Sequence, residues 1–274
     1  MSHSNFKAMV IQFYKYEGCG NDFVIIDERS GELQLSESQI AAICDRRFGI
    51  GADGVLLLGN HAEYDFQMVY FNADGSRATM CGNGGRCLSA FAHKMNAMGD
   101  KGKFIADDGP HTAEIQWIED TITQVAISMK DATPQEVSAQ HIFINTGTPH
   151  YVLFVDDIET ADVVETGRKI RNNSQFAPTG TNVNFVQLAP GEIFVRTYEK
   201  GVEEETLACG TGVTASAMAA SLRTGFTDFD VKARGGNLHV SFDKKEHTFT
   251  NVILTGPARL VYTGEFDLQS IQRR

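Results

Sequence analysis

A cysteine followed by glycine, a small polar residue and glycine occurs twice in the chain, each time ahead of a run with helical character. The first copy begins Cys81-Gly82-Asn83-Gly84 and the second begins Cys209-Gly210-Thr211-Gly212, at an offset of 128 residues (209 minus 81). A cysteine at the start of a helix lies beside unpaired backbone N–H groups and the positive end of the helix dipole, which favour its thiolate. Two such cysteines suggest a matched pair of reactive groups, one in each half of the chain.

Other landmarks recur at the same offset. The matching pairs are Phe23 and Tyr151, Phe48 and Phe176, Val55 and Val183, and Tyr70 and Tyr198. Self-similarity at a fixed offset is typical of repeated structural units. We therefore predict an α/β (α+β) protein of two pseudo-symmetric modules, in which each module wraps a mixed β-sheet or barrel around its central cysteine helix. A pseudo-two-fold axis would then bring the two helix N-termini face to face across a cleft.

Hydrophobic periodicity and turn residues predict the elements of each module. Strands are expected at 10–15, 23–27, 55–58, 66–71, 104–106, 112–117 and 121–129 in the first half, and at 141–144, 151–155, 183–188, 193–198 and within 231–262 in the second. Ser36 and Gln39 match a capping box that opens a helix ending at Cys44. A further helix is expected at 162–171.

The two cysteine helices differ in pattern. The first carries apolar residues at the spacing of one helical face, which predicts an amphipathic helix. These residues are Leu88, Phe91, Ala92 and Met95. The second is small and nearly uncharged as far as Leu222, so it is expected to be buried on most sides.

The length of 274 residues suits two domains of ordinary size. We predict an N-terminal module at 1–130 plus 266–274, which carries Cys81, and a C-terminal module at 131–265, which carries Cys209. Residues 130–135, which include Pro134, are the expected linker.

Composition narrows the class of function. The formal net charge is −11 and no basic block occurs, which argues against a nucleic-acid partner. No apolar run approaches the roughly 20 residues that cross a membrane, and the N-terminus lacks an apolar signal core. The odd number of five cysteines indicates a reduced, cytoplasmic protein. No CxxC pair or histidine pair has the spacing of metal ligands, so no metal site is expected.

The paired cysteines suit inversion at a carbon atom. One group removes a proton from one face of a bound molecule, and the other returns a proton to the opposite face. Two helix N-termini aimed at a substrate carboxylate would stabilise the carbanion-like state. No cofactor-binding pattern is found and no lysine stands out as a Schiff-base candidate, so we expect no cofactor.

Some motifs have plainer interpretations. Cys44 and Cys87, on predicted helix faces, and Cys19, in a glycine turn, are interpreted as small buried side chains. The acidic run at 203–205 is expected to be a solvated charge run. The glycine-rich loop at 49–54 lacks the following Lys-Ser/Thr of a phosphate-binding loop.

Four segments together resemble the diaminopimelate epimerase family, in the family order and over nearly the whole chain. They are Gly18-Cys19-Gly20-Asn21-Asp22-Phe23, Phe71-Asn72-Ala73-Asp74-Gly75-Ser76, Cys81-Gly82-Asn83-Gly84 and Ala208-Cys209-Gly210-Thr211-Gly212. The resemblance implies cofactor-independent interconversion of LL- and meso-2,6-diaminopimelate by a thiolate and a thiol, in the biosynthesis of lysine and peptidoglycan precursors. It also implies a homodimer, and two similar modules with the C-terminal strand returning to the first.

The resemblance also implies a role for each matching residue. Cys81 and Cys209 would be the acid/base pair, with Cys209 accepting and Cys81 donating the proton in the LL-to-meso direction. His150 and Glu199 would tune the pKa values of the two cysteines. The substrate would be bound by Asn21, Asn72, Gly82, Asn83, Asn182, Glu199, Lys200, Gly210 and Thr211. Tyr262 resembles the family's dimer-contact tyrosine.

Four features depart from the family pattern. Lys200 stands in place of an arginine, which keeps the charge and loses the bidentate fork. One residue is inserted within 202–205. Thr148 stands where asparagine is frequent, and Gly54 stands where some members have glutamine.

Three alternatives remain open at this point. A racemase or epimerase of another amino acid, such as proline, would need no distal contacts of the kind that Asn72, Asn182 and Lys200 offer. A thiol redox protein would cycle a disulfide between Cys81 and Cys209. A non-catalytic amino-acid-binding module would bind without exchanging the α-proton with solvent.

Overall fold

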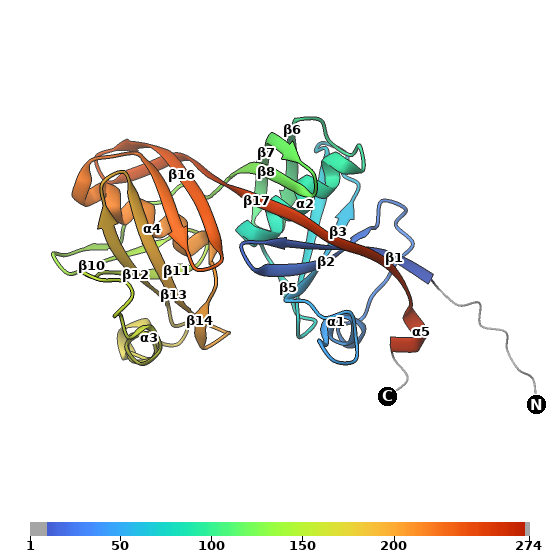
Figure 1. Cartoon of the computed structure of the whole chain (residues 1–274), viewed down its shortest axis with the longest axis horizontal. Coiled ribbons are helices and arrows are strands. Elements are labelled where there is room, and N and C mark those ends of the chain that lie inside the picture. Colours follow the sequence, from blue (N-terminus) through green and yellow to red (C-terminus); the bar gives the residue numbers. More distant parts are fainter. Residues whose placement is uncertain (1–9, 272–274) are drawn as a thin grey trace, which may run out of the picture.

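The structure is a computed structural model that describes residues 10–271 of the chain. Two lobes are joined by the segment at 129–135 and by one long strand, and a helix lies at the centre of each lobe (Figure 1). The first lobe contains β1 (Val10–Gly18), β2 (Asn21–Asp27), α1 (Glu37–Cys44), β3 (Gly54–Gly59), β4 (Phe66–Asn72), β5 (Arg77–Ala78), α2 (Gly82–Lys94), β6 (Lys101–Ala106), β7 (Gly109–Glu119) and β8 (Ile122–Ser128). The second lobe contains β9 (Glu136–Val137), β10 (His141–Asn145), β11 (Pro149–Phe154), α3 (Val163–Arg171), the 3₁₀ turn η1 (Ser174–Phe176), β12 (Asn182–Ala189), β13 (Glu192–Glu199), β14 (Glu204–Thr206), α4 (Gly210–Thr224), β15 (Asp228–Ala233) and β16 (Gly236–Lys245). The described chain ends with β17 (Thr248–Asp267) and α5 (Leu268–Ile271).

Eight strands close the first lobe into a barrel. Neighbours pair in the order β1, β2, β3, β4, β6, β7, β8 and β17, and β17 pairs with β1 to complete the ring. Helix α2 packs against several of these strands, and it is buried without a break from Gly82 to Ala92. The predicted one-sided, amphipathic helix is therefore wrong for the first three turns, because the barrel surrounds them.

The second lobe repeats this arrangement. Its strands pair in the order β9, β10, β11, β12, β13, β15, β16 and β17. Ala132 closes the ring through a bridge to Phe249, with backbone N···O distances of 3.0 and 2.9 Å. The predicted linker at 130–135 is thus hydrogen-bonded into the barrel. Helix α4 is buried from Val213 to Ser221, as its composition predicted.

Strand direction identifies the two lobes as copies of one module. In the first lobe β2 runs parallel to β3 and β4 runs parallel to β6. In the second lobe β11 runs parallel to β12 and β13 runs parallel to β15, at the same places in the order. The predicted α/β fold of two pseudo-symmetric barrels around central helices is therefore confirmed.

The offset of 128 does not hold along every strand. Val55 and Val183 both pack in the clusters around α1 and α3, outside their barrels. Phe23 belongs to the barrel interior, whereas Tyr151 packs in the outer cluster around α3. Because side chains alternate along a strand, a drift of one residue puts matching letters on opposite faces. Phe23 and Tyr151 are therefore not equivalent positions of the repeat, and matching them was wrong. Tyr70 and Tyr198 likewise lie on opposite faces, one inside its barrel and the other in the outer cluster.

Strand β17 belongs to both barrels. It pairs with β16 as far as Thr255, with β8 from Gly256 to Arg259, and with β1 as far as Asp267. In Figure 1 it crosses the molecule between the lobes. The strand leaves the second barrel and joins the first at Gly256, ten residues before the predicted boundary at 266. The division of the chain into one module at 1–130 plus 266–274 and another at 131–265 stays a prediction. None of the described helices combines the length and apolar character needed to span a membrane.

The predicted capping box opens α1. Ser36 Oγ accepts a hydrogen bond from the Gln39 backbone N–H at 3.3 Å, and Gln39 Oε1 accepts one from the Ser36 N–H at 2.7 Å. We expect Ser36→Ala to lower the free energy of unfolding by about 1 kcal/mol, because one helix-end donor loses its partner. Urea unfolding of the variant measures this, with Gln39→Ala as the reciprocal variant. An unchanged midpoint in both variants would contradict the assignment.

Candidate active site

The N-termini of α2 and α4 meet where the two barrels face each other. Cys81 is the N-cap of α2 and Cys209 is the N-cap of α4. A Cβ atom on Gly210 would lie 3.1 Å from Cα of Gly82, so glycine at both positions allows the two helix ends to touch. The structure therefore brings together the two cysteines that the repeat predicted as a pair.

Both cysteine sulfurs are surrounded by helix-end donors. Burial raises the pKa of the Cys81 thiol, while hydrogen bonds from the backbone N–H groups of Gly84 and Asn83 act in the opposite direction. Burial likewise raises the pKa of Cys209, against hydrogen bonds from Thr211 and Gly212. Removing water makes a thiolate expensive, and the helix ends supply the compensating donors.

Cys81 lies in a group of amides. Its Sγ is 3.5 Å from Asn21 Oδ1, and Asn83 Nδ2 is 3.3 Å from the same oxygen. Asn83 Nδ2 also donates to the carbonyl oxygen of Ala208, which precedes Cys209, at 3.0 Å. The predicted residues Asn21 and Asn83 therefore connect the two halves of the site.

Cys209 lies instead beside hydroxyl groups and an imidazole. Thr211 Oγ1 is 3.4 Å from Cys209 Sγ. The same oxygen is 3.0 Å from His150 Nε2 and 3.1 Å from Thr148 Oγ1. Thr148 Oγ1 is itself 3.0 Å from His150 Nε2, so the threonine at 148 places a hydroxyl next to the imidazole.

His150 is fully buried and is held from both sides. Asn184 Nδ2 lies 3.0 Å from His150 Nδ1, and Asn184 Oδ1 accepts from Thr197 Oγ1 at 2.9 Å. Burial lowers the pKa of His150 to about 3, and the charge of Lys200 acts in the same direction. The imidazole is therefore neutral near pH 7, and it donates through Nε2 because Nδ1 accepts from Asn184.

A buried neutral histidine makes stability depend on pH. His150 binds a proton in the unfolded chain below about pH 6.5 but in the folded protein only near pH 3, so its contribution to stability falls as pH drops through this window. We expect the parent protein to lose up to about 1.4 kcal/mol per pH unit more than His150→Gln between pH 6 and 4. Denaturant unfolding of both proteins across this range measures the difference. Parallel curves would contradict a neutral, buried His150.

Glu199 lies at the end of β13, close to both cysteines. Burial raises the pKa of its carboxyl group, and its charge raises the pKa of Cys81 and of Cys209. Glu199 therefore raises the pKa values of both thiols together. This is consistent with the predicted tuning role, which stays a prediction.

Lys200 and Asn182 are joined through the backbone. The Lys200 N–H donates to Asn182 Oδ1 at 2.8 Å, and Asn182 Nδ2 is 3.5 Å from Thr148 Oγ1. Asn182 is buried, whereas Lys200 is half-buried. Both residues therefore lie at the His150 side of the site.

The sequence predicted a solvated charge run at 203–205, and this holds for Glu204, whose side chain is 62% exposed, but not for Glu205. Glu205 forms ion pairs with Arg196 at 2.7 Å and with Arg234 at 3.0 Å, and only 10% of its side chain is exposed. Glu203 has a φ of 61° and pairs with Arg171 at 3.0 Å. The extra residue is accommodated in a loop that ion pairs anchor to the barrel wall.

Three further positions that the sequence singled out are Asn72, Gly54 and Tyr262. Asn72 donates to Ser76 Oγ in its own turn at 3.1 Å. A Cβ atom on Gly54 would lie 2.7 Å from Tyr70 Cε2, so Tyr70 fills the space that a longer side chain would need. Tyr262 lies apart from the site on β17, where 45% of it is exposed.

The remaining cysteines are buried, as the sequence indicated. Cys44 and Cys87 belong to the cores. Cys19 has a φ of 54°, and its Sγ lies 3.8 Å from Arg86 Nη2. Cys19 therefore packs behind Arg86.

Sequence reasoning missed three polar residues behind the first layer of the site. Asp53 Oδ2 accepts from Asn21 Nδ2 at 2.7 Å, and Arg86 Nη2 donates to Asn83 Oδ1 at 2.9 Å. The third is Asn184, which holds His150. The signal for Arg86 was a charged residue among the small residues at the start of α2. The signal for Asn184 was an asparagine between apolar residues of a strand.

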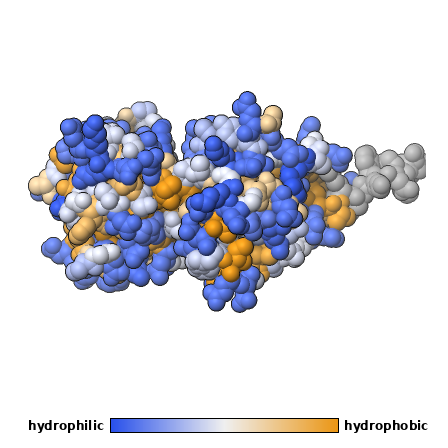
Figure 2. Space-filling view, turned by 90° about the horizontal axis from the view of Figure 1, so that it is seen from above, coloured by the Kyte–Doolittle hydropathy of each residue, from blue (hydrophilic) through white to orange (hydrophobic). Residues whose placement is uncertain are grey.

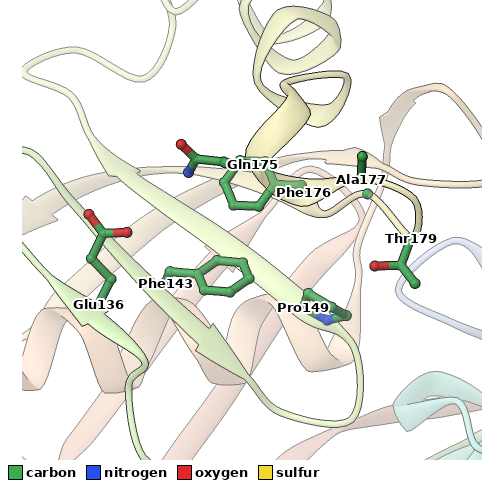
Figure 3. Close-up of a pocket in the computed structure, with 8 residues that line it drawn as sticks. Glu136, Phe143, Pro149, Gln175, Phe176, Ala177 and Thr179 are labelled. Atoms are coloured by element: carbon green, nitrogen blue, oxygen red, sulfur yellow. The ribbon is translucent and has the colours of Figure 1, made fainter.

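A shallow depression of about 410 Å³ lies away from the cysteines (Figure 3). It is lined by residues of β9, β10 and the η1 region, including Phe143 and Phe176, whose ring centroids are 5.2 Å apart. None of the predicted site residues lines it. In a space-filling view the molecule shows a notch between its two lobes (Figure 2).

Comparison with known proteins gives one family over both modules. The family model of diaminopimelate epimerase matches residues 13–133 and 142–261. The diaminopimelate epimerase of Flavobacterium psychrophilum is 47% identical over 92% of this chain and 98% of its own. That of Aquifex aeolicus is 38% identical over 96% of this chain and 100% of its own.

Solved structures with much lower identity share the fold. A phenazine biosynthesis protein of the PhzF family from Bacillus anthracis has a TM-score of 0.74 at 13% identity, covering 94% of this chain and 99% of its own. A hydroxyproline epimerase from Agrobacterium vitis, with bound trans-4-hydroxy-L-proline, has a TM-score of 0.72 at 14% identity, covering 95% and 93%. These likenesses concern the fold, while the full-length sequence matches identify the family. The chain belongs to the diaminopimelate epimerase family.

Proposed function

We propose that this protein is an isomerase that interconverts LL- and meso-2,6-diaminopimelate without a cofactor, in the biosynthesis of lysine and peptidoglycan precursors. The observation that carries the proposal is the contact between the two helix ends, each with its cysteine at the N-cap, in a chain of this family. A substrate carboxylate placed at this junction would meet backbone donors from both helices. The α-carbon next to it would then lie between two sulfurs.

The proposed chemistry is a two-base proton transfer. In the LL-to-meso direction the Cys209 thiolate takes the α-proton, and the electron pair of the C–H bond delocalises into the adjacent carboxylate. The Cys81 thiol then gives its proton to the opposite face of the carbon. Cys209 ends as a thiol and Cys81 as a thiolate, so the reverse reaction uses the same groups with exchanged roles. Donors at Gly82, Asn83, Gly210 and Thr211 would stabilise the added negative charge.

The alternative is a racemase or epimerase of a smaller amino acid, since a hydroxyproline epimerase shares the fold. Diaminopimelate has a second amino-carboxylate group at its far end. Asn72, Asn182 and Lys200 offer polar groups for it, with Asn182 joined to the His150 side of the site. These residues and the full-length relatives favour diaminopimelate as the substrate.

Incubation with substrate in D2O tests the proposal. We expect the reduced protein to exchange the α-proton of LL-diaminopimelate with solvent and to form the meso isomer, as followed by NMR, and to leave L-proline unchanged. Exchange of L-proline alone would favour the smaller substrate. Binding without exchange would indicate a binding module, and reversible disulfide cycling coupled to a reductant would indicate a redox protein.

We also propose a cytoplasmic homodimer with Tyr262 at its interface. The five cysteines are all free, which suits a reducing compartment. Val261 and Tyr262 are 51% and 45% exposed on β17, and such exposed apolar side chains favour a protein contact. We expect Tyr262→Ala to shift the protein toward monomer in sedimentation velocity, with Val137→Ala, on β9 of the other barrel, as the control. A monomeric parent would contradict this part of the proposal.

A further inference from the structure

Asn21 lies between the Cys81 sulfur and the Asp53 carboxylate. Its Nδ2 donates to Asp53 Oδ2 at 2.7 Å, and its Oδ1 is 3.5 Å from Cys81 Sγ. A carboxylate only accepts hydrogen bonds, so Asp53 determines which end of the Asn21 amide faces it. The amide oxygen of Asn21 is thereby directed at the sulfur.

Arg86 fixes the same orientation from the other side. Its guanidinium only donates, and Nη2 donates to Asn83 Oδ1 at 2.9 Å. Asn83 therefore presents Nδ2 to two acceptors, the Ala208 carbonyl oxygen at 3.0 Å and Asn21 Oδ1 at 3.3 Å. A reversed Asn21 would place two amide NH2 groups against each other, so both anchors require the observed arrangement.

This arrangement favours the thiol form of Cys81. An S–H group donates to an amide oxygen, whereas a thiolate would face the negative end of the amide dipole. A hydrogen bond that only the neutral form of an acid can make favours that form.

The surroundings of Cys209 have the opposite polarity. The Lys200 N–H donates to Asn182 Oδ1, which turns Asn182 Nδ2 toward Thr148 Oγ1. Thr148 Oγ1 and His150 Nε2 both approach Thr211 Oγ1, at 3.1 and 3.0 Å. This geometry lets Thr211 accept from His150 and Thr148 and donate its own proton to Cys209 Sγ, 3.4 Å away. A hydroxyl donor at the sulfur favours the thiolate.

We propose that Asp53 is a positioning residue which, through Asn21, holds Cys81 as the thiol in the ligand-free protein, while the Thr211 hydroxyl holds Cys209 as the thiolate. The proposal rests on the proposed function, because it places the free enzyme in the protonation state that accepts the proton of the LL isomer. Asp53 acts through the Asn21 amide, which lies between its carboxylate and the Cys81 sulfur.

Other charged and titratable groups face the two sulfurs, and the test has to separate their effects. Glu199 acts on both cysteines in the same sense, and the Arg86 charge favours the Cys81 thiolate although its hydrogen bond to Asn83 opposes it. Tyr70 and Asp53 also face this group. Substituting Asp53 removes a charge as well as an acceptor, so a variant that removes the charge alone is needed as a control.

The experiment is alkylation of the reduced, ligand-free protein by iodoacetamide across pH, with each cysteine followed separately by mass spectrometry. The pH dependence at one cysteine reports its thiolate fraction independently of its accessibility. In the parent protein we expect a lower apparent pKa for Cys209 than for Cys81. Asp53→Ala frees Asn21 to turn its NH2 group to Cys81, and we expect alkylation of Cys81 near pH 7 to rise about tenfold, which is one pKa unit.

Two variants are matched controls. Asp53→Asn removes the charge but keeps an oxygen that accepts from Asn21, and we expect Cys81 to stay near the parent. Arg46→Gln removes the ion pairs of Arg46 with Asp53 at 2.7 Å and with Asp22 at 2.6 Å but keeps the acceptor of the Asn21 amide, and the same result is expected. Equal effects of Asp53→Ala and Asp53→Asn, or no effect of Asp53→Ala, would overturn the positioning role.

The parent protein decides the proposal even where Asp53→Ala does not fold. An apparent pKa at Cys81 equal to or below that at Cys209 would overturn it. The failure of the proposed function looks different, because it would leave LL-diaminopimelate unexchanged in D2O whatever the alkylation pattern. An active enzyme with the reversed order of cysteine pKa values would refute the positioning role alone.

Discussion

Cys209→Ala is expected to lower net epimerisation of LL-diaminopimelate by about 10³-fold or more, because the group that removes the α-proton is lost. Cys81→Ala should have an effect of similar size in the same direction, since no group then returns a proton to the opposite face. The two cysteines stand at equivalent N-caps of α2 and α4, and neither can replace the other across the substrate. Steady-state assay of LL-to-meso conversion measures both variants.

The expected residual activity distinguishes the two-base mechanism from a general loss of structure. Cys209→Ala keeps Cys81, so it should still exchange one α-proton of the meso isomer with solvent although it forms no LL isomer. Cys87→Ala, in the core on α2, is a control for loss of a buried thiol. Substantial net epimerisation by either Cys81→Ala or Cys209→Ala would remove the two-base account.

Gly235→Ala is expected to be the most damaging substitution outside the cysteines. A Cβ atom at Gly235 would lie 1.8 Å from the backbone oxygen of Cys19 and 3.1 Å from Leu207 Cβ. This contact joins the β1–β2 turn of the first barrel to the β15–β16 turn of the second, next to the segment that leads into Cys209. Because the obstacle is backbone, the barrels must move apart, and we expect a loss of about 3 kcal/mol in unfolding free energy together with reduced kcat/KM.

Gly99→Ala is the matched control for this substitution. Among the described residues, no atom beyond its chain neighbours lies within 4 Å of the position that a Cβ atom on Gly99 would take. Its φ is not positive, so alanine should be accepted there with little change. Thermal unfolding and the epimerase assay measure both variants. Equal stability and activity of Gly235→Ala and the parent would show that the barrels do not rely on this contact.

The internal repeat predicted the larger part of the fold. Two glycine-flanked cysteines at one offset indicated two modules, and the strand order of the two barrels repeats accordingly. The offset failed for Phe23 and Tyr151 because one residue of drift reverses the face of a strand. One constant offset cannot show where the two copies differ in length by a residue, so it cannot predict which face of the strand a side chain takes.

The inner site was predictable and its supports were not. Asn21, Asn83, His150 and Thr211 follow from the family motifs, and the structure brings them to the two cysteines. Asp53 reaches Asn21 across 32 positions of sequence through the parallel pairing of β2 with β3. Such contacts depend on tertiary structure.

The acidic loop gives a similar lesson about charge. A run of three glutamates is typical of a solvated surface, yet Glu205 is held between two arginines that come from β13 and from the turn after β15. The partners are not neighbours in sequence. The two arginines bury Glu205, whereas Glu204 in the same run stays 62% exposed.

The central claim is that two different groups act on opposite faces of the α-carbon. It is tested most directly by the isotope content of the first product that LL-diaminopimelate yields in D2O at low conversion. Two bases predict meso-diaminopimelate with deuterium at the inverted carbon, while the unreacted LL isomer keeps its protium. Product that retains substrate-derived protium at the inverted carbon would show that one group removes and returns the same proton, and would contradict the account.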